Sequence, residues 1–350
     1  MQIDRPEGKI VVDQKLGSGA MGLVFRGWLF YDPNGPNRSR EPLPIALKQL
    51  KPLANTQAEL RELFVNEAES LKRIAHPNIV RFIDLFDWKS ATDSRAKPLL
   101  TLAMEYVEGD PLEAVIARVG ARSQLSGMRC LPIPRAWSYF QQLLGALAAV
   151  EALELAHRDI KPANVLIRKD GIVKLADFGI ARLHASDAKD AVSPGTGAYM
   201  SPEQVLGKPL DARSDLYSAA IVFYEMLAGR TPFAIEGLTE FAVRRNHVEK
   251  TPEPISTWLP ASPGLDAIFA RAFAKDRNYR FPNAIALGEA FRIALSLPDT
   301  PEWRLQQEFA KEAPAMHRDP TTEREARVAT LRLQMVERYR TAPLPKGPTR

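Results

Sequence analysis

The sequence changes character at about residue 108, and this change constrains the fold more than any other feature. Before it, short runs rich in β-branched and apolar residues alternate with turns, as is typical of strands, and one helical pattern covers Gln57–Ile74. After it, most segments have the spacing of amphipathic helices. We therefore predict an α+β chain, with a small five-stranded antiparallel sheet and one helix followed by a larger, mainly helical part.

The pattern along the chain also predicts individual elements. Strands are predicted at Lys9–Leu16, Leu23–Leu29, Ile45–Leu50, Val80–Trp88 and Leu99–Tyr106. Helices are predicted at Leu112–Val119, Pro134–Leu155, Ser214–Ala228, Glu240–Glu249, Leu265–Ala274 and Asn283–Leu295. The turn Lys169-Asp170-Gly171 between two short apolar runs predicts a hairpin. From Pro298 onward the sequence is charged, predicts a helix at Thr321–Arg340, and ends in a Pro-rich stretch typical of a linker or tail.

Composition excludes several classes of protein. The 350 residues, 45% of them hydrophobic and 25% charged, are typical of a soluble globular protein large enough for two lobes. The net charge of +5 is spread along the chain without a basic stripe, which argues against nucleic-acid binding. The single cysteine, Cys130, excludes an internal disulfide, and no Cys/His cluster offers a zinc site. Since no run of about 18 apolar residues occurs, we expect no membrane span and a cytoplasmic location.

A glycine-rich turn, Gly17-Ser18-Gly19-Ala20-Met21-Gly22, lies between the first two predicted strands. Glycines at this spacing allow the backbone to lie close to phosphate groups and to direct N–H groups at their oxygens. On its own the turn is weak evidence, because many such turns bind nothing and dinucleotide-binding folds use a similar spacing. Here the turn leads into a strand instead of a helix, which argues against a dinucleotide site.

A lysine on the third predicted strand, Lys48, follows the apolar residues Ile45-Ala46-Leu47. A cation in such surroundings needs partners, and phosphate oxygens and a carboxylate are the natural ones. The helix that follows carries several glutamates, of which Glu67 is nearest its middle. Taken singly, Lys48 could also be a surface lysine that extends to solvent, and Glu67 could belong to a solvated helix face.

A polar segment, His157-Arg158-Asp159-Ile160-Lys161-Pro162-Ala163-Asn164, lies between a long predicted helix and the predicted hairpin. It gathers a carboxylate, cations and a carboxamide, a set that can orient a hydroxyl, neutralise phosphate and hold a metal. Asp177-Phe178-Gly179 follows the hairpin and adds a second carboxylate for a hard cation such as Mg²⁺. An isolated Asp-Phe-Gly carries no information, but its place after this loop and hairpin does.

Together these segments resemble the motifs of eukaryotic-type protein kinases, and their residues are most similar to those of bacterial serine/threonine kinases. In chain order the motifs are Leu16–Val24, Ala46–Lys48, His157–Asn164, Asp177–Gly179, Gly195–Gln204 and Asp215–Ser218. The resemblance covers roughly residues 8–296. It implies the bilobal protein kinase fold, with an N-lobe at 1–107, a C-lobe at 108–296, and a charged, partly helical extension at 297–350 that ends in a Pro-rich tail.

The resemblance also implies where ATP binds. The residues it places at ATP are Leu16, Gly17, Ser18, Gly19, Gly22, Val24, Ala46, Lys48, Met104, Glu105, Val107 and Leu166. Among them, the glycines cover the phosphates, and Lys48 holds the α- and β-phosphates while it pairs with Glu67. Met104 is the expected gatekeeper behind the adenine, which meets the backbone of Glu105 and Val107.

The catalytic assignments follow from the same resemblance. Asp159 is expected to accept the proton of the substrate hydroxyl, and Lys161 to contact the γ-phosphate. Asn164 and Asp177 are expected to coordinate Mg²⁺, for which Mn²⁺ can substitute. Structural roles are implied for an ion pair of Glu203 with Arg280, for Asp215 as a brace of the catalytic loop, and for the Thr196 hydroxyl as a hydrogen-bond partner of Asp159 and Lys161.

Two features indicate serine/threonine specificity. Lys161 stands two residues after the expected catalytic aspartate, and Gly195-Thr196 follows the activation segment, as in serine/threonine members of the family and unlike tyrosine kinases. Arg158 stands just before Asp159. In kinases with an arginine at this position, a phosphate on the activation segment often orders that segment by pairing with the arginine. The candidate phosphorylation sites are Ser193, Ser186 and Thr196, and Asp190 could substitute in part for a phosphate.

The implied reaction is transfer of the γ-phosphoryl of ATP to serine or threonine hydroxyls of proteins, including the chain itself, for which a dimer is one route. The alternative is a pseudokinase scaffold or nucleotide-sensing module. That alternative predicts the loss of Lys48, Asp159, Asn164 or Asp177, and none is lost. A small-molecule kinase is disfavoured because Ser201-Pro202-Glu203 and the next helix resemble a platform for protein substrates. The predicted insertions at 31–44, 89–97 and 122–131 carry no assigned role.

Overall fold

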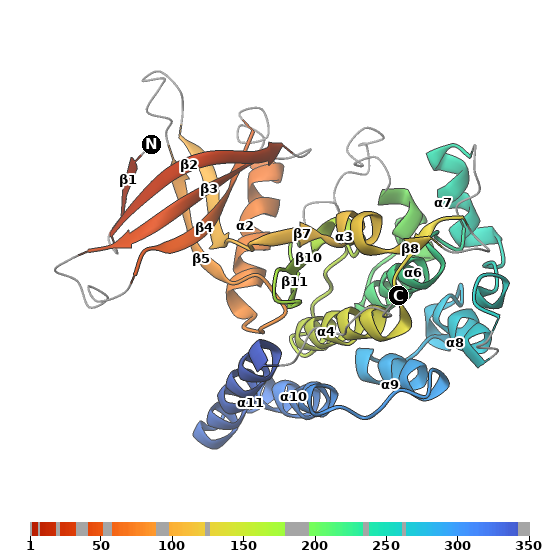
Figure 1. Cartoon of the computed structure of the whole chain (residues 1–350). Coiled ribbons are helices and arrows are strands. Elements are labelled where there is room, and N and C mark those ends of the chain that lie inside the picture. Colours follow the sequence, from red (N-terminus) through yellow and green to blue (C-terminus); the bar gives the residue numbers. More distant parts are fainter. Residues whose placement is uncertain are drawn as a thin grey trace. The chain divides into compact units, whose positions relative to one another are not determined.

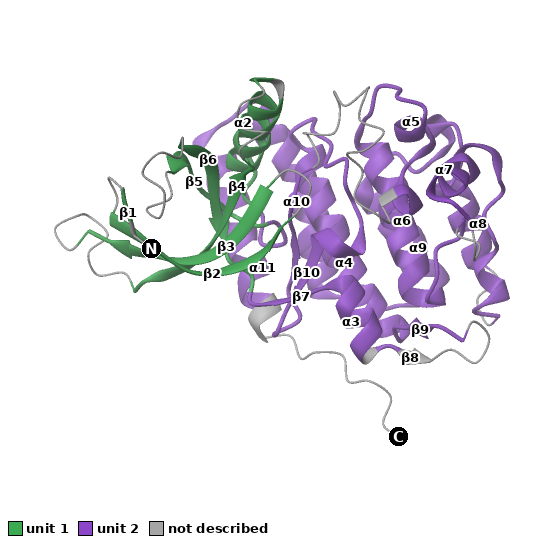
Figure 2. Cartoon of the chain, turned by 90° about the horizontal axis from the view of Figure 1, so that it is seen from above, with its two compact units in different colours: residues 1–75, 80–107, 179–193 green, residues 76–79, 108–178, 194–350 purple. Residues whose placement is uncertain are grey.

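The computed structural model describes residues 2–5, 8–18, 22–32, 41–51, 58–88, 98–122, 127–178, 196–233, 238–260 and 264–341. The chain divides into two compact units (Figure 2). The first unit comprises residues 1–75, 80–107 and 179–193, and the second residues 76–79, 108–178 and 194–350. No helix among the described residues has both the length and the apolar character needed to cross a membrane.

The first unit is an antiparallel sheet with one helix (Figure 1). The strands are β1 (Gln2–Arg5), β2 (Gly8–Ser18), β3 (Gly22–Tyr31), β4 (Leu43–Leu50), β5 (Phe82–Trp88) and β6 (Leu99–Glu105), in the sheet order β1-β2-β3-β4-β6-β5. Five of these are the predicted strands. The sixth, β1, is additional: its sequence is too polar to predict a strand, and it forms by antiparallel pairing along the edge of β2.

Alternation along β4 decides which of its side chains enter the core of the first unit. Ile45 and Leu47 are fully buried and pack in one cluster with β2, β3, β5 and β6, whereas Ala46 and Lys48 point to the opposite face. The helix α2 (Ala58–Arg73) buries Phe64, Ala68 and Leu71 along one face, at the spacing expected for an amphipathic helix.

The second unit is mainly helical (Figure 1). Its helices are α3 (Leu112–Val119), α4 (Ile133–Glu151), α5 (Pro202–Val205), α6 (Ala212–Ala228), α7 (Glu240–Glu249), α8 (Gly264–Ala272), α9 (Ala284–Ala294), α10 (Pro301–Arg318) and α11 (Thr322–Thr341). Its 3-10 turns are η1 (Pro162–Asn164), η3 (Thr196–Tyr199), η4 (Ile255–Thr257) and η5 (Arg277–Tyr279). Its small sheets are β11 (Val173–Leu175), β10 (Val165–Arg168) and β7 (Gly109–Pro111), in that order, and β8 (Ala121–Arg122) with β9 (Arg129–Cys130).

Aromatic side chains join the central helices of this unit. The rings of Phe140 on α4 and Phe223 on α6 stack with centroids 4.1 Å apart, and Phe291 on α9 meets Phe223 edge-on at 4.9 Å. All three side chains are fully buried. This packing fixes α4, α6 and α9 relative to one another, and these helices support the polar loops of the second unit.

The chain after α9 folds into a helical hairpin of α10 and α11, and α10 packs on α4 and α9 (Figure 1). The sequence predicts α11 but not α10, because the segment is charged and carries Pro314 in its interior. Its start nevertheless has a clear signal, since Thr300 caps the helix by accepting the Trp303 N–H at 3.2 Å and Pro301 occupies the first turn.

The hairpin is anchored by Trp303, whose side chain is fully buried. Its ring meets that of Trp137 on α4 edge-on at 5.5 Å, and its indole N–H donates to Glu289 on α9 at 3.1 Å. On α11, a stripe of Val328, Leu331 and Met335 is buried at helical spacing. The extension is therefore part of the hydrophobic core of the second unit.

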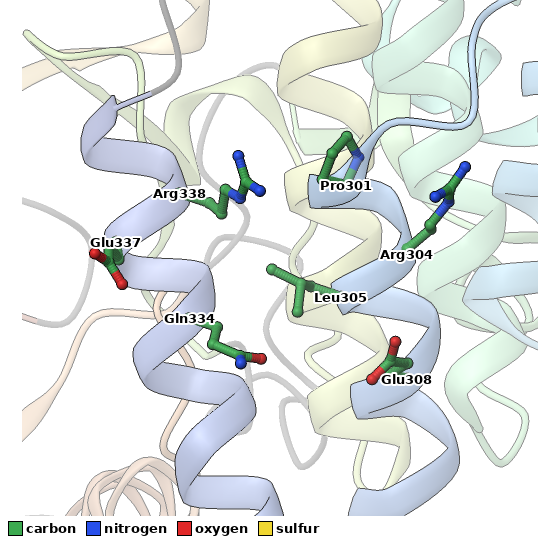
Figure 3. Close-up of a pocket in the computed structure, with 7 residues that line it drawn as sticks. All are labelled: Pro301, Arg304, Leu305, Glu308, Gln334, Glu337 and Arg338. Atoms are coloured by element: carbon green, nitrogen blue, oxygen red, sulfur yellow. The ribbon is translucent and has the colours of Figure 1, made fainter.

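A groove lies between α10 and α11 near the start of α10 (Figure 3). It is lined by Pro301, Arg304, Leu305, Glu308, Gln334, Glu337 and Arg338. Leu305 and Arg338 point into the space between the helices (Figure 3). Five of its seven lining residues are polar or charged and none is a predicted site residue, so this groove is separate from the candidate active site.

We expect Trp303→Ala to lower the free energy of unfolding by about 3–5 kcal/mol, because it removes a fully buried aromatic side chain and leaves a cavity. Urea denaturation of the full chain measures the change. The control is Leu333→Ala on α11, where the side chain is 71% exposed and the expected loss is about 0.5 kcal/mol. Equal losses for the two variants would contradict the docking of α10.

A buried ion pair joins α5 to the turn after η5. Both guanidinium NH groups of Arg280 donate to the Glu203 carboxylate at 2.7 Å, and Ser214 donates to the same carboxylate at 2.6 Å. The two charged side chains are 1% and 7% exposed. Burial alone would raise the pKa of Glu203, but the hydrogen bonds and charge of Arg280 outweigh it and hold that pKa below its ordinary value.

We expect Arg280→Leu to destabilise the chain by about 3–5 kcal/mol at neutral pH, because a buried carboxylate loses its partner. Because the folded-state pKa of Glu203 is below 4.5, the pair stabilises the chain above pH 4.5 and is lost as the pH falls through that lower pKa, so the penalty should shrink in acid. Urea titrations at several pH values measure both effects. Arg327→Leu, which breaks a half-exposed pair with Glu308, is the control and should cost about 0–1 kcal/mol.

Candidate active site

The centre of the candidate site is the loop His157–Asn164, which follows α4 and ends in η1. Asp159 is only 8% exposed. Its Oδ2 accepts a hydrogen bond from the Asn164 side chain at 2.7 Å and lies 3.2 Å from the Lys161 ammonium. Asn164 also donates to the Asp159 backbone carbonyl at 2.8 Å. These contacts bring three of the predicted catalytic and metal-binding residues together and hold the carboxylate in one orientation.

The loop is held from beneath by Asp215 in the first turn of α6. Its two carboxylate oxygens accept the backbone N–H groups of His157 at 2.6 Å and of Arg158 at 2.8 Å. Arg158 has φ of 71°, a left-handed conformation that costs energy for a side chain of this size. Burial raises the pKa of Asp215 to about 7, although the two N–H bonds act in the opposite direction. Two hydrogen bonds donated by the loop to a carboxylate on a rigid helix thus fix a strained backbone.

His157 connects this loop to the end of β11. Its Nδ1 accepts the Asp159 N–H at 3.4 Å, so its Nε2 carries the proton and donates to the Ala176 carbonyl at 3.1 Å. The imidazole ring lies against that of Phe178 with centroids 4.4 Å apart. His157 belongs to a motif recognised in the sequence but has no predicted role; its buried ring connects the loop His157–Asn164 to the end of β11.

Asp177 follows β11 and adopts φ of 56°, with its side chain exposed. The preceding residue, Ala176, donates its N–H to the Asn164 carbonyl at 2.9 Å, so Asn164 and Asp177 come from directly hydrogen-bonded segments. Because the Asn164 NH₂ group is directed at Asp159, its side-chain carbonyl oxygen points away from that carboxylate. Two oxygen donors of this kind suit a hard divalent cation. Among the residues described, no cluster of three His, Cys, Asp or Glu side chains forms a separate metal site.

The first unit holds the predicted lysine–glutamate pair. The Lys48 ammonium lies 2.7 Å from Glu67 Oε1, and the side chains are 15% and 5% exposed. The ammonium also lies 5.9 Å from the centre of the Phe64 ring. Lys48 is therefore turned toward α2 and is not extended into solvent.

Strand register gathers other predicted nucleotide-binding residues on the same face as Lys48. Val24 on β3 is directly opposite Lys48, and Met104 on β6 is directly opposite Ala46. Since successive side chains alternate between faces, Ala46 and Lys48 share a face with these two partners. This face is opposite to the one that carries the buried side chains of Ile45 and Leu47.

The other residues predicted to bind ATP lie on or next to several strands. Leu16 is 42% exposed on β2, and a Cβ at Gly17 would meet no atom within 4 Å. A Cβ at Gly22 would lie 2.7 Å from the Gln49 carbonyl oxygen, so glycine is also required there by the approach of β3 to β4. The Glu105 N–H donates to the Arg81 carbonyl at 2.9 Å. Ser18 ends β2 and Val107 follows β6, both in the first unit, while Leu166 lies on β10 of the second unit.

Several sequence-based candidates lie outside the described residues. These are Gly19, Gly179, Ser186, Asp190 and Ser193, and for Thr196 the structure describes only the backbone, at the start of η3.

The structure also shows contacts that sequence reasoning missed. The Tyr199 hydroxyl donates to Glu225 on α6 at 2.7 Å, and burial raises the pKa of Glu225 to about 7. Gln204 caps α5 together with Ser201 and donates to the Arg158 carbonyl at 2.8 Å. A usable signal for the first pair was present, because Glu225 is the one acidic residue in an otherwise apolar run of α6.

Several known proteins are similar to this chain in sequence. The family model described as "Protein kinase domain" matches residues 10–289. Serine/threonine-protein kinase PksC of Streptomyces coelicolor is 35% identical over 302 residues, which cover 84% of this chain and 50% of PksC. A probable serine/threonine-protein kinase PknB of Bifidobacterium longum is 38% identical over 250 residues, which cover 69% of this chain and 34% of that protein.

A solved structure is similar as well. The PknI kinase domain of Mycobacterium tuberculosis is 28% identical, with a TM-score of 0.59 over 81% of this chain and 96% of the domain. The protein kinase fold predicted from the sequence is therefore confirmed. The chain spans about a third to a half of the length of PknB and PksC. With a matching family model over most of its length, the chain belongs to the protein kinase family.

Proposed function

We propose that the chain transfers the γ-phosphoryl group of ATP to serine or threonine hydroxyls of proteins, including its own. The observation that carries the proposal is the convergence of Asn164 and Lys161 on one oxygen of Asp159, in a loop hydrogen-bonded to the segment that bears Asp177. The similarity to PksC and PknB, which are named as serine/threonine-protein kinases, supports the same activity.

In this proposal Asp159 receives the substrate hydroxyl and accepts its proton as the hydroxyl oxygen bonds to the γ-phosphorus, while the bond from that phosphorus to the β–γ bridging oxygen breaks and ADP leaves. Lys161, 3.2 Å from Asp159, lies where it can also contact the γ-phosphate and offset its charge. The hydrogen bond from Asn164 prevents the Asp159 carboxylate from rotating. The residues act mainly by positioning and charge stabilisation, because phosphoryl transfer requires little covalent chemistry from the protein.

The protein kinase family implies ATP together with a divalent metal ion. We propose that the metal is Mg²⁺, with Mn²⁺ as a substitute, and that Asn164 and Asp177 supply its protein oxygens. The donor set fits, since the Asn164 carbonyl is turned away from Asp159 and the Asp177 side chain is exposed. When bound, Mg²⁺ supplies positive charge to the phosphate oxygens.

The first unit would supply the other contacts to the nucleotide. The buried pair of Lys48 with Glu67 positions an ammonium for the α- and β-phosphates. Val24 and Ala46 would offer an apolar face to the base. The carbonyl of Glu105 and the backbone of Val107 would hydrogen-bond the adenine edge, and the glycine turn Leu16–Gly22 would cover the phosphates.

Substrate class and domain roles complete the proposal. Lys161 at its position after Asp159 favours serine and threonine over tyrosine. Residues 1–107 would act as the N-lobe, 108–296 as the C-lobe and 297–350 as an extension. Autophosphorylation would occur between two copies of the chain, in the cytoplasm, where ATP is supplied.

Phosphorylation of the activation segment would regulate this activity. The Arg158 side chain is half-buried, and its Nε has no hydrogen-bond partner among the described residues. Burial also lowers the pKa of this guanidinium, which means that its charge lacks full compensation. A phosphate on Ser193, with Ser186 and Thr196 as alternatives, would provide charge-assisted hydrogen bonds to it.

We expect Asp159→Asn to lower phosphate transfer from radiolabelled ATP by roughly 100-fold or more, because the loop loses its proton acceptor. Lys48→Met should have a comparable effect through the nucleotide. The matched controls are Asp299→Asn and Lys72→Met, the same substitutions at exposed positions, and both should retain wild-type rates. Labelled serine and threonine should appear in a generic basic protein and in the chain itself. Wild type that binds ATP but labels neither would favour the pseudokinase alternative.

We expect Ser193→Ala to lower activity about tenfold, the equivalent of one charge-assisted hydrogen bond. In an Arg158→Met background the same substitution should have no further effect, since the partner of the phosphate is gone. Kinetic assays of the four variants measure the coupling, and mass spectrometry after incubation with ATP locates the phosphate. Absence of phosphate between Leu183 and Met200 would contradict this part of the proposal.

A further inference from the structure

A buried polar cluster forms where α10 meets α4 and the segment His76–Ile79. At its centre is Gln306 of α10, which is fully buried. Its side-chain NH₂ donates to Asn78 Oδ1 at 3.1 Å, and its carbonyl oxygen lies 3.2 Å from His76 Nε2. Asn78 is also fully buried, and His76 is 7% exposed. Each end of one amide therefore meets a different side chain of the same short segment.

The hydrogen bonds determine which group donates. The Asn78 N–H donates to His76 Nδ1 at 3.2 Å, so the proton of this ring is on Nε2 and is donated to Gln306. Burial lowers the pKa of His76 to about 3, and the ring is neutral at physiological pH. The amide of Gln306 can thus fit in one orientation, with its oxygen toward His76 and its nitrogen toward Asn78.

Asn78 transmits this arrangement to β11. Its side-chain NH₂ donates to the Val173 carbonyl and to Gln142 Oε1, each at 3.0 Å. Gln142 Oε1 in turn accepts the Val173 N–H at 2.9 Å, and the Asn78 carbonyl accepts the Leu175 N–H at 2.8 Å. The strand that leads to Asp177 is therefore hydrogen-bonded, on this side, to a residue that Gln306 holds.

Neighbouring residues leave little freedom for Gln306 to move. A Cβ added at Gly145 on α4 would lie 2.0 Å from its side-chain oxygen. One turn along α10, Phe309 meets the His76 ring edge-on at 5.0 Å. Both α10 and its glutamine lie beyond residues 10–289, which the kinase family model matches. The cluster is completed by a segment that lies outside the residues matched by the family model.

We propose that Gln306 is a positioning residue for phosphoryl transfer: through Asn78 it fixes β11, and thereby the place of Asp177 as a metal ligand. The inference rests on the function proposed above, in which Asp177 coordinates the metal. It assigns the C-terminal extension a part in catalysis beyond its contribution to stability. Residues that orient metal ligands from behind commonly alter metal affinity or activity by 10–100-fold when replaced.

The test uses the full chain with Gln306→Leu. Leucine is similar in size to glutamine and suits a buried position, but it leaves the His76 N–H and Asn78 Oδ1 without a partner. The control is Trp303→Phe, which also weakens the docking of α10 but leaves the Gln306 contacts intact. We expect the Mg²⁺ concentration for half-maximal activity to rise about 10-fold or more in Gln306→Leu and to stay unchanged in Trp303→Phe. Thermal unfolding of both variants identifies any general loss of stability.

Hydrogen exchange provides a readout that needs no nucleotide or metal. The amides of Val173 and Leu175 should exchange about 10-fold faster in Gln306→Leu, while Trp303→Phe should match wild type there. Gln306→Glu serves if the leucine variant fails to fold, because it keeps the shape but presents an oxygen to Asn78 Oδ1. Equal effects of the Gln306 and Trp303 variants on exchange and on Mg²⁺ dependence would overturn the proposal. If wild type transferred no phosphate, the proposed function would fail, and the exchange measurements would still decide whether Gln306 fixes β11.

Discussion

The geometry of the candidate site depends on the two hydrogen bonds that the carboxylate of Asp215 accepts. This carboxylate lies in the first turn of α6, a helix buried over most of its length, and accepts the amides of His157 and Arg158. These bonds hold Arg158 in a left-handed conformation that an unsupported chain would leave. From there His157 donates to the Ala176 carbonyl, so the anchored carboxylate is connected to both Asp159 and the residue that precedes Asp177. A site held by core helices has the rigidity that phosphoryl transfer requires.

Much of this architecture could be predicted because its causes are local. Apolar residues at alternate positions of β4 indicate which face is buried and leave Lys48 on the other. The Lys169-Asp170-Gly171 turn predicts the β10–β11 hairpin, and Gly171 has the positive φ, 84°, that such a turn needs. The spacing within His157–Asn164 brings Asp159, Lys161 and Asn164 together on one loop, and their contacts need nothing distant beyond Asp215.

The features that escaped prediction arise from contacts between distant parts of the chain. Gln306 is one of several polar residues on a charged helix, and only its packing against α4 and Asn78 distinguishes it from a solvated glutamine. The strand β1 has no pattern of its own and forms because β2 offers an open edge. The pairing of Tyr199 with Glu225 likewise depends on how η3 lies over α6. Periodicity and motifs carry no information on such contacts between distant segments.

Two glycines of the kinase domain lie directly against side chains of the C-terminal extension. A Cβ at Gly145 would collide with Gln306, and a Cβ at Gly288 on α9 would lie 2.4 Å from the Trp303 ring. Glycine inside a helix costs about 1 kcal/mol relative to alanine. At Gly145 the three nearest atoms to such a Cβ all belong to Gln306, whereas at Gly288 the Leu144 side chain of α4, at 2.7 Å, adds to the restriction imposed by Trp303. Glycine at these two positions thus lets the side chains of α10 approach the backbones of α4 and α9 more closely than any other residue would allow.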